Sequence, residues 1–408
     1  MSIPSHRRTL AKGLIFVGVA TLVGNGAAYL LSMIAARVLT PEAFGALGAL
    51  LGLLVIFSTV GIAMQALTAR RVAVAGDDRQ DVEGQAIRLS VIIAAVLAII
   101  GVAVAWPVGT FFTIPYVAVA SGIASIGFVV IGSAAMGIAQ GREEHARLSW
   151  AFIANGVGRA LGGMLGVVVF RNVTGVGVGV LVGCAIGAFI AYRLICPDRW
   201  SPALSAGVAA EFGHVVHALA VLFTLTNVDV LLARVFLTEA ESGEYSVGVL
   251  LAKIAFFLPN AIIIVLFPKM TAGRSSRTVY LATGLTALVG AVIIAFSYVF
   301  GDLVIRILGG AQYTELGSEA WLFALEGSAF ALVQVLLYAR LATQDRRAVG
   351  AVWAALVALV AIVSIWRHGS VTEIVTTVVV VSLVLTIVGL IMDRRQTPAM
   401  PIPVESAE

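Results

Sequence analysis

The chain has 408 residues, of which 60% are hydrophobic and only 12% are charged, and its mean hydropathy is +1.04. A soluble domain carries about 25% charged residues because its surface faces water, so this composition excludes a soluble enzyme or helical repeat and indicates a surface that faces lipid. The net charge of +4 is small and the basic residues are not clustered on one face, which excludes a nucleic-acid-binding protein.

Apolar segments along the chain predict about twelve transmembrane helices, because a bilayer core about 30 Å thick requires roughly 20 apolar residues as helix. The first segment follows Arg7, Arg8 and Lys12 but is too long for a signal peptide, so it is predicted to be an uncleaved helix. A linker around residues 197–202 divides the chain into an N-terminal unit, 1–200, and a C-terminal unit, 201–408. The predicted helices span residues 14–36, 44–66, 89–109, 116–138, 148–170, 175–195, 213–235, 245–267, 279–300, 319–339, 348–366 and 371–392.

The placement of basic residues predicts the orientation of these helices. With the N-terminus in the cytoplasm, 19 Lys and Arg residues fall in cytoplasmic segments and five fall in outer loops. Basic residues accumulate on the cytoplasmic side of membrane proteins. Both termini are therefore predicted to be cytoplasmic, in a multi-pass protein of the plasma (inner) membrane.

Two short sequence matches indicate that the halves are related. Ala-Arg-Val-Leu-Thr-Pro-Glu-Ala at residues 36–43 closes the first helix, and Ala-Arg-Val-Phe-Leu-Thr-Glu-Ala at residues 233–240 closes the seventh. Gln-Gly-Arg at 140–142 and Gln-Asp-Arg at 344–346 occupy a second pair of equivalent places. Each half has an even number of helices, so the symmetry axis is predicted along the membrane normal. Arg37 and Arg234, within the first match, are expected to snorkel to lipid headgroups, although they could border an outer gate.

The chain contains Gly24-Asn25, residues 36–45, Asn227-Val228-Asp229, residues 243–246, Phe267-Pro268-Lys269, and Leu308-Gly309-Gly310 with Tyr313. These stretches resemble the polysaccharide exporters and Wzx-type oligosaccharide flippases of the multidrug/oligosaccharidyl-lipid/polysaccharide (MOP) exporter superfamily, over nearly the whole chain. This resemblance implies an all-α, MATE/MOP-like membrane fold of two homologous six-helix bundles around a central cavity that opens alternately to each side. It also implies a polyprenyl-pyrophosphate-linked sugar as cargo. Many members have fourteen helices, so twelve argue against a peptidoglycan-precursor role.

Ionisable residues within the predicted helices are candidate functional residues, because a charge in the membrane centre is costly. The guanidinium of Arg159 suits a pyrophosphate or a sugar hydroxyl, but backbone carbonyls between helices could equally satisfy it. Asn25 and Gln65 could bind sugars or neighbouring helices. The predicted translocation set is Asn25, Gln65, Asn155, Arg159, Asn227, Asp229, Lys253 and Glu326.

Three of these residues are predicted to share one depth. At 1.5 Å per residue, Asp229, Lys253 and Glu326 fall roughly 9 to 12 Å below the outer boundary, whereas the repeat-equivalent Val55 and Gly122 are uncharged. One hypothesis is that Lys253 exchanges its carboxylate partners for a cargo pyrophosphate or responds to a proton. The alternative is a structural ion pair within one bundle.

Other patterns are assigned to packing or to a polar surface. Gly158, Gly162 and Gly166 predict a close helix-packing seam. Glu211, with the histidines at 214 and 217, predicts an interfacial polar face more readily than a metal site. No catalytic set, nucleotide loop or metal motif is evident, so we predict a transporter that is not an enzyme, with no metal and no cofactor.

The sequence therefore predicts a transporter that flips polyprenyl-pyrophosphate-linked oligosaccharide from the inner to the outer leaflet by alternating access. Its expected partners are the lipid-linked glycan, membrane lipid and the glycosyltransferases or polymerase of the same pathway, and it is expected to be monomeric. Two alternatives are a drug or metabolite antiporter of the same superfamily and a non-transporting scaffold for glycosyltransferases. A scaffold has no need of buried charge, which favours transport.

Overall fold

A computed structural model describes residues 3–195, 207–259, 276–341 and 346–394, and the regular structure in these ranges is helical. The first half contains six long helices and one short 3-10 turn, η1 (Gly76–Asp78). They follow the first six predicted segments, several of them extended by a few turns. These helices are α1 (Ile3–Val38), α2 (Pro41–Val74), α3 (Arg79–Phe111), α4 (Tyr116–Gly141), α5 (His145–Phe170) and α6 (Val173–Ile195).

The second half provides a helical counterpart for each of the other six predicted segments, which confirms the predicted fold class. Within the described ranges, nine helices of the chain are long and apolar enough to cross a membrane, and one bent pair would be a tenth. The end of the segment predicted at 245–267 lies outside the described residues. The elements are α7 (Val208–Leu225), α8 (Val228–Phe236), α9 (Glu239–Phe257), α11 (Ser276–Val299), α12 (Gly301–Leu308), η2 (Ala311–Glu319), α13 (Ala320–Leu341), α14 (Arg346–Ile365) and α15 (Val371–Arg394).

The seventh predicted helix is broken rather than continuous. Its parts α7 and α8 meet at an angle of 49° around Thr226 and Asn227. The Thr226 hydroxyl donates to the carbonyl of Leu222 at 3.2 Å, and the Asn227 amide donates to the carbonyl of Phe223 at 2.9 Å. Because such side chains compete with the backbone for helical carbonyls, the adjacent Thr and Asn account for the break.

Equivalent threonines begin the second helix of each half. The Thr40 hydroxyl accepts from the backbone N–H of Ala43 at the start of α2, and Pro41 occupies the first helical position. Thr238 begins α9 in a reciprocal capping box with Glu241. Both arrangements satisfy backbone donors that a helix start leaves unpaired. The repeated stretch therefore ends one helix and begins the next in the same way in both halves.

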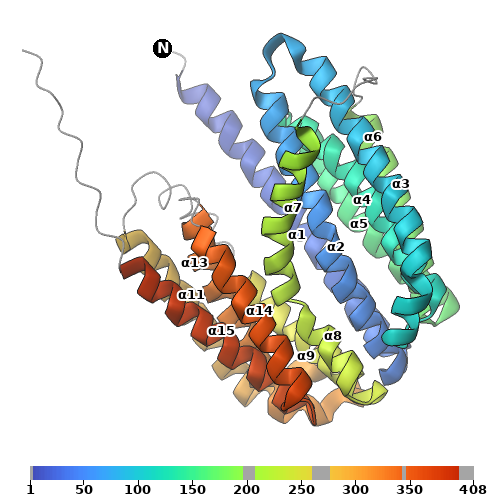
Figure 1. The fold of residues 1–408 in the computed structure, drawn as a ribbon, viewed down its shortest axis with the longest axis vertical. Coiled ribbons are helices and arrows are strands. Elements are labelled where there is room, and N and C mark those ends of the chain that lie inside the picture. Colours follow the sequence, from blue (N-terminus) through green and yellow to red (C-terminus); the bar gives the residue numbers. More distant parts are fainter. Residues whose placement is uncertain (1–2, 196–206, 260–275, 342–345, 395–408) are drawn as a thin grey trace, which may run out of the picture.

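Figure 1 shows the helices gathered in two bundles, α1–α6 and the helices that follow α7. The bundles meet at the end where α8 and α9 approach α2, and they diverge toward the other end. We call the meeting end the outer end, since it carries the loops predicted to face outward, and the other the cytoplasmic end. α7 lies between the bundles and contacts both α2 and α14.

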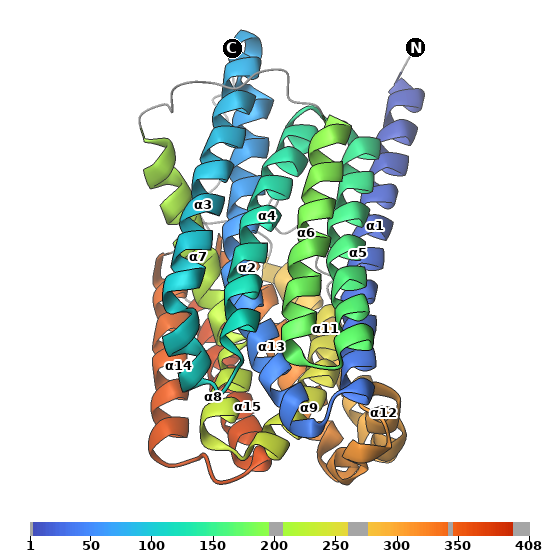
Figure 2. The ribbon, with the colours of Figure 1, turned by 90° about the vertical axis from the view of Figure 1, so that its right-hand side faces the viewer.

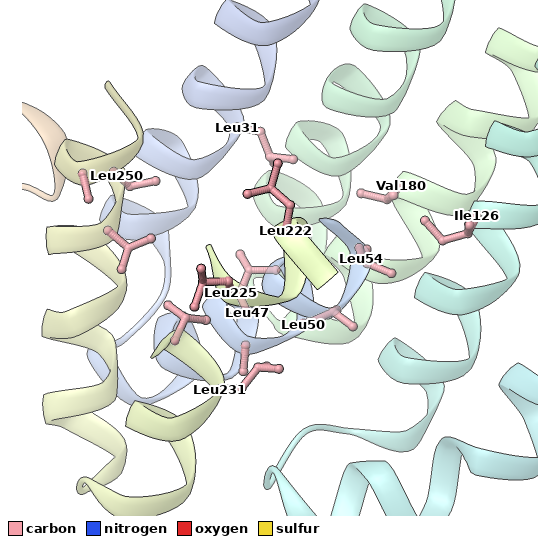
Figure 3. Packing of buried hydrophobic residues seen from close by; sticks show 14 of the residues in the cluster. Leu31, Leu47, Leu50, Leu54, Ile126, Val180, Leu222, Leu225, Leu231 and Leu250 are labelled. Atoms are coloured by element: carbon pink, nitrogen blue, oxygen red, sulfur yellow. The ribbon is translucent and has the colours of Figure 1, made fainter. Parts of the chain in front are cut away.

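The contact between the bundles is largely apolar at its centre. Leu47 and Leu50 of α2 are almost fully buried and lie beside Leu225 and Leu231 of the broken helix, with Leu250 of α9 nearby (Figure 3). Since lipid tails are as apolar as leucine, such packing is held by close van der Waals contact. The leucine contacts at this centre can therefore separate without breaking an ion pair.

Within the first bundle, α5 and α6 pack along the predicted glycine seam. A Cβ atom placed on Gly162 would lie 2.1 Å from the carbonyl oxygen of Gly179, and one on Gly166 would lie 2.0 Å from that of Gly175. No real side chain fits at such distances, so the close approach requires glycine. The seam prediction is confirmed, and it fixes the helix that carries Arg159.

Candidate functional site

A cavity of about 260 Å³ lies between the two bundles. Its walls come from α1, α2 and α5 on one side and from the broken helix, α9 and α13 on the other. Phenylalanines 223, 256, 257 and 330 contribute aromatic surface on the second side. The cavity therefore lies at the junction that must change if the bundles move relative to each other.

Three charged residues gather on the second wall, as the sequence predicts. Asp229 and Glu326 are each only 1% exposed, and their carboxyl groups interact with each other. The Tyr245 hydroxyl donates to Asp229 Oδ2 at 3.3 Å. Lys253 interacts electrostatically with both carboxyl groups. The three side chains thus form one cluster drawn from three different helices.

The break between α7 and α8 explains how a carboxylate is tolerated at this depth. Asp229 lies in the first turn of α8, directly after the break at Asn227. A helix start carries partial positive charge and unpaired N–H groups, which stabilise an anionic side chain. An unbroken helix would place Asp229 in mid-helix and remove that stabilisation.

Within the described helices, Lys253 forms no close ion pair with Asp229 or Glu326. Among the ion pairs of the described part of the chain, none with an N–O distance within 4 Å joins Lys253 to Asp229 or Glu326. Lys253 also lines the cavity and interacts with Arg159 on the opposite wall. Two cations from different bundles therefore face the same space, which favours an anion between them.

The first wall carries a polar stripe on α1. Asn25, Tyr29 and Ser32 recur at helical spacing and line the cavity, with Ser58 of α2 and Arg159 of α5 beside them. Sequence reasoning identified Asn25 and Arg159 but missed Tyr29 and the two serines. Their spacing of four and three residues was the available signal, since such positions share one helix face.

The structure brings six of the eight predicted residues to this cavity and separates two. Gln65 donates its side-chain amide to Gln140 Oε1 at 2.9 Å, so it bridges α2 and α4. Asn155 is buried against Gly132 of α4, where a Cβ atom would lie 2.3 Å from its Nδ2. Both serve helix packing in this arrangement. The six residues at the cavity are Asn25, Arg159, Asn227, Asp229, Lys253 and Glu326.

The positions that the repeat makes equivalent to the cluster are apolar or small. Val55, the counterpart of Lys253, lines the cavity without a charge. Gly122, the counterpart of Glu326, packs against Leu50 and Leu54 of α2. The site is thus asymmetric although the helices around it are arranged in pairs.

Glu211, from the predicted polar face, links two helices. It forms ion pairs with Arg70 and with Arg71, whose Nη2 lies 3.1 Å from Glu211 Oε2. These pairs join α2 to α7 near the cytoplasmic end. His217 stacks on Trp353 of α14, with ring centroids 5.8 Å apart. The side chain of His214 lies outside the described residues.

The chain is similar to one protein family and to several solved structures. The profile of a family described as polysaccharide biosynthesis protein matches residues 10–274. A lipid II flippase MurJ in an inward closed conformation is 12% identical, with a TM-score of 0.77 over 93% of this chain and 87% of that one.

Two conformations of multidrug resistance MATE family transporters of the MOP superfamily also match. The inward-facing one is 14% identical, with a TM-score of 0.76 over 92% of this chain and 97% of that chain. The outward-facing one is 16% identical, with a TM-score of 0.66 over 94% of this chain and 95% of that chain. No curated protein matches the sequence.

Proposed function

The chain belongs to the polysaccharide biosynthesis protein family, within the MOP exporter superfamily, and from this we propose that it flips a polyprenyl-pyrophosphate-linked oligosaccharide from the inner to the outer leaflet for surface polysaccharide synthesis. Alternating access between an N-terminal lobe, residues 1–200, and a C-terminal lobe, residues 201–408, would carry the headgroup across.

One observation carries this proposal, the facing of Arg159 and Lys253 across the cavity. A pyrophosphate presents several anionic oxygens, and a planar guanidinium binds such oxygens in pairs. A lysine ammonium opposite adds a compact point charge. Bound between them, the cargo would connect the two lobes, so that its arrival and departure are coupled to their relative position.

The polar stripe along one wall of the cavity supports a headgroup as its occupant. The cavity volume of about 260 Å³ is smaller than the roughly 300–1,000 Å³ of common ligand pockets. A pyrophosphate with the first sugar is a reasonable content, whereas a longer glycan requires the lobes to separate further. The Asn25, Tyr29 and Ser32 stripe offers hydrogen-bonding groups to sugar hydroxyls.

A drug antiporter is the second candidate, favoured by the two buried carboxyl groups of Asp229 and Glu326. A cationic drug would pair with them, and Phe223 and Phe256 line the cavity, where they would offer cation–π contacts. The two cations that face the cavity argue against such a cargo, because they would repel it.

Reconstitution into liposomes separates these functions. A fluorescent polyprenyl-pyrophosphate oligosaccharide placed in one leaflet should move to the other faster in the presence of the protein, as reported by a membrane-impermeant quencher. A polyprenyl monophosphate without the glycan serves as control. Transport of a cationic dye down an ion gradient, without flipping of the lipid-linked glycan, would refute the proposal in favour of the antiporter.

A further inference from the structure

Two arginines at equivalent positions of the internal repeat reach from one bundle to the other at the outer end. Arg37 lies in the last turn of α1, and Arg234 lies in the last turn of α8. The sequence favoured snorkelling of both toward lipid headgroups and left open that they border an outer gate. Instead, each guanidinium donates hydrogen bonds to backbone carbonyls of the opposite bundle.

Arg37 contacts the end of α12. Its Nη2 donates to the carbonyl of Ile307, with the carbonyls of Arg306 and Leu308 each 3.5 Å from the guanidinium. A further bond of 2.8 Å from Nη1 to the carbonyl of Met33 holds the side chain against its own helix. Figure 2 shows α12 directly beside the end of α1.

Arg234 contacts the end of α3. Its Nε donates to the carbonyl of Phe112 at 2.9 Å, and its Nη2 donates to the carbonyl of Thr113 at 3.0 Å. A third bond of 3.3 Å reaches the carbonyl of Glu42. Phe112 and Thr113 follow the last helical residue of α3, whereas Glu42 lies in the first turn of α2. Arg234 therefore contacts the end of the third helix of the first half, and Arg37 contacts α12, the short helix that follows the third helix of the second half.

The acceptors suit an arginine for a simple electrostatic reason. The carbonyls of Ile307 and Leu308 are among the last four of α12, which have no partner within the helix. Those of Phe112 and Thr113 directly follow α3, at a helix end that carries partial negative charge. A guanidinium presents several N–H donors in one plane and can bond neighbouring carbonyls together. Gln312 adds a hydrogen bond from the second bundle to the first beside Arg37, since its Nε2 donates to the carbonyl of Ala36 at 2.6 Å.

The hydrogen bonds of Arg234 are costly to break unless water replaces them, because the side chain is buried. The Arg234 side chain is only 2% exposed, and its one carboxylate neighbour, Glu239, is 3.4 Å away and 56% exposed. A buried cation that loses its acceptors must be hydrated. Separation of the bundles at this end would therefore require both arginines to exchange carbonyls for water at the same time.

We propose that Arg37 and Arg234 form a reciprocal pair of helix caps that holds the outer side of the protein closed, whatever the cargo. Each bundle supplies one arginine and one helix end, so the two contacts are related by the internal symmetry. Loss of either arginine should favour the outward-open arrangement. This device lies at the outer loops, apart from the cavity cluster, and its test requires no substrate.

Spin labels report the separation of the outer ends. They can be placed at Thr110 of α3 and at Arg367 after α14, both exposed, with Cys184 and Cys196 replaced by alanine. Double electron–electron resonance on the protein in nanodiscs then gives the distribution of distances. Arg37→Ala and Arg234→Ala should each raise the ratio of long to short distances about tenfold, which corresponds to about 1.4 kcal/mol, and the double variant should raise it further.

Arg171→Ala is the matched control, because this exposed arginine ends α5 at the same end of the molecule. Distributions for Arg37→Ala and Arg234→Ala that equal the wild type, or an equal shift for Arg171→Ala, would overturn the proposal. Arg37→Lys and Arg234→Lys keep the charge but not the planar fork, so each should shift the ratio less in the same direction. If the alanine variants do not fold, unshifted lysine variants would overturn it as well.

Discussion

Gly45 of α2 and Gly243 of α9 face each other where the outer ends of the bundles meet. A Cβ atom on Gly45 would lie 2.8 Å from the backbone nitrogen of Gly243, and one on Gly243 would lie 2.1 Å from the carbonyl oxygen of Pro41. Each glycine lies five residues after the threonine of the repeated stretch, Thr40 or Thr238. The two helices therefore cross on the internal symmetry axis at a separation that excludes any side chain.

Gly243→Ala should prevent this crossing. A methyl group 2.1 Å from a backbone oxygen cannot be accommodated by a rotamer change, so α2 and α9 must separate at the outer end. The variant should show longer outer distances in the spin-label measurement. Gly26→Ala, where an added Cβ meets nothing within 4 Å, is the control and should leave the distances unchanged.

Replacement of Lys253 by methionine should weaken cargo binding without unfolding the protein. A charge-assisted hydrogen bond contributes about 1.5–3 kcal/mol, so we expect a roughly ten- to hundredfold loss of affinity for a polyprenyl-pyrophosphate glycan, and Lys253→Ala should abolish transport. Arg159→Met should act in the same direction. Val55→Met, at the repeat-equivalent position, is the matched control in a flipping assay. Normal transport by Lys253→Met at normal expression would remove the cluster from the cargo path.

Asp229→Asn tests whether the cluster is a switch or only a structural pair. The amide keeps the shape of the carboxyl group and can still accept from Tyr245, so the melting temperature should change little. Transport should nevertheless fall, because Lys253 loses a partner to which it can return after cargo release. Glu326→Gln should behave similarly. A large fall in melting temperature with unchanged transport per folded molecule would support the purely structural role.

Glu83→Gln should reduce stability rather than transport. Glu83 is 1% exposed and pairs with Arg142, which also donates to the carbonyl of Ile195 at 3.3 Å. This connects α3, α4 and α6 at the cytoplasmic end. Removing one partner of such a buried pair costs about 3–5 kcal/mol, which thermal unfolding in detergent would detect. Glu144→Gln, at a carboxylate 30% exposed, should cost less than about 1 kcal/mol.

The orientation of the chain can be checked independently of transport. Reporter fusions after Arg394 and within residues 107–113 should report opposite sides of the membrane, with the first in the cytoplasm, because basic residues accumulate on that side. Reports from the same side would contradict the arrangement of twelve helices.

Much of the fold was accessible from sequence because lipid imposes a simple rule on helix length and polarity. All twelve segments have helical counterparts, and the glycine seam between α5 and α6 followed from spacing alone. The clustering of Asp229, Lys253 and Glu326 followed from counting depth along each helix. These features depend on periodicity, which one sequence displays.

Other features depended on which helices meet, which spacing does not reveal. The break at Thr226 and Asn227 falls inside one apolar run, 213–235, that is long enough to cross the membrane, so the sequence predicted a continuous helix. The sequence did not distinguish a cavity-lining Asn155 from a packing one, because its neighbour Gly132 belongs to a different helix. Arg37 and Arg234 suited headgroups equally well, because the carbonyls that accept from them belong to distant segments.

The acceptors of both outer arginines are backbone carbonyls, which every residue type possesses. The last turn of α12 and the loop that follows α3 can therefore change their side chains widely without losing the contact, provided that the chain keeps its path, as at Gly310 with φ of +101°. The two donors have no such freedom. A library randomised at residues 112 and 306–308 should retain many functional members, while one randomised at residues 37 and 234 should return arginine at both.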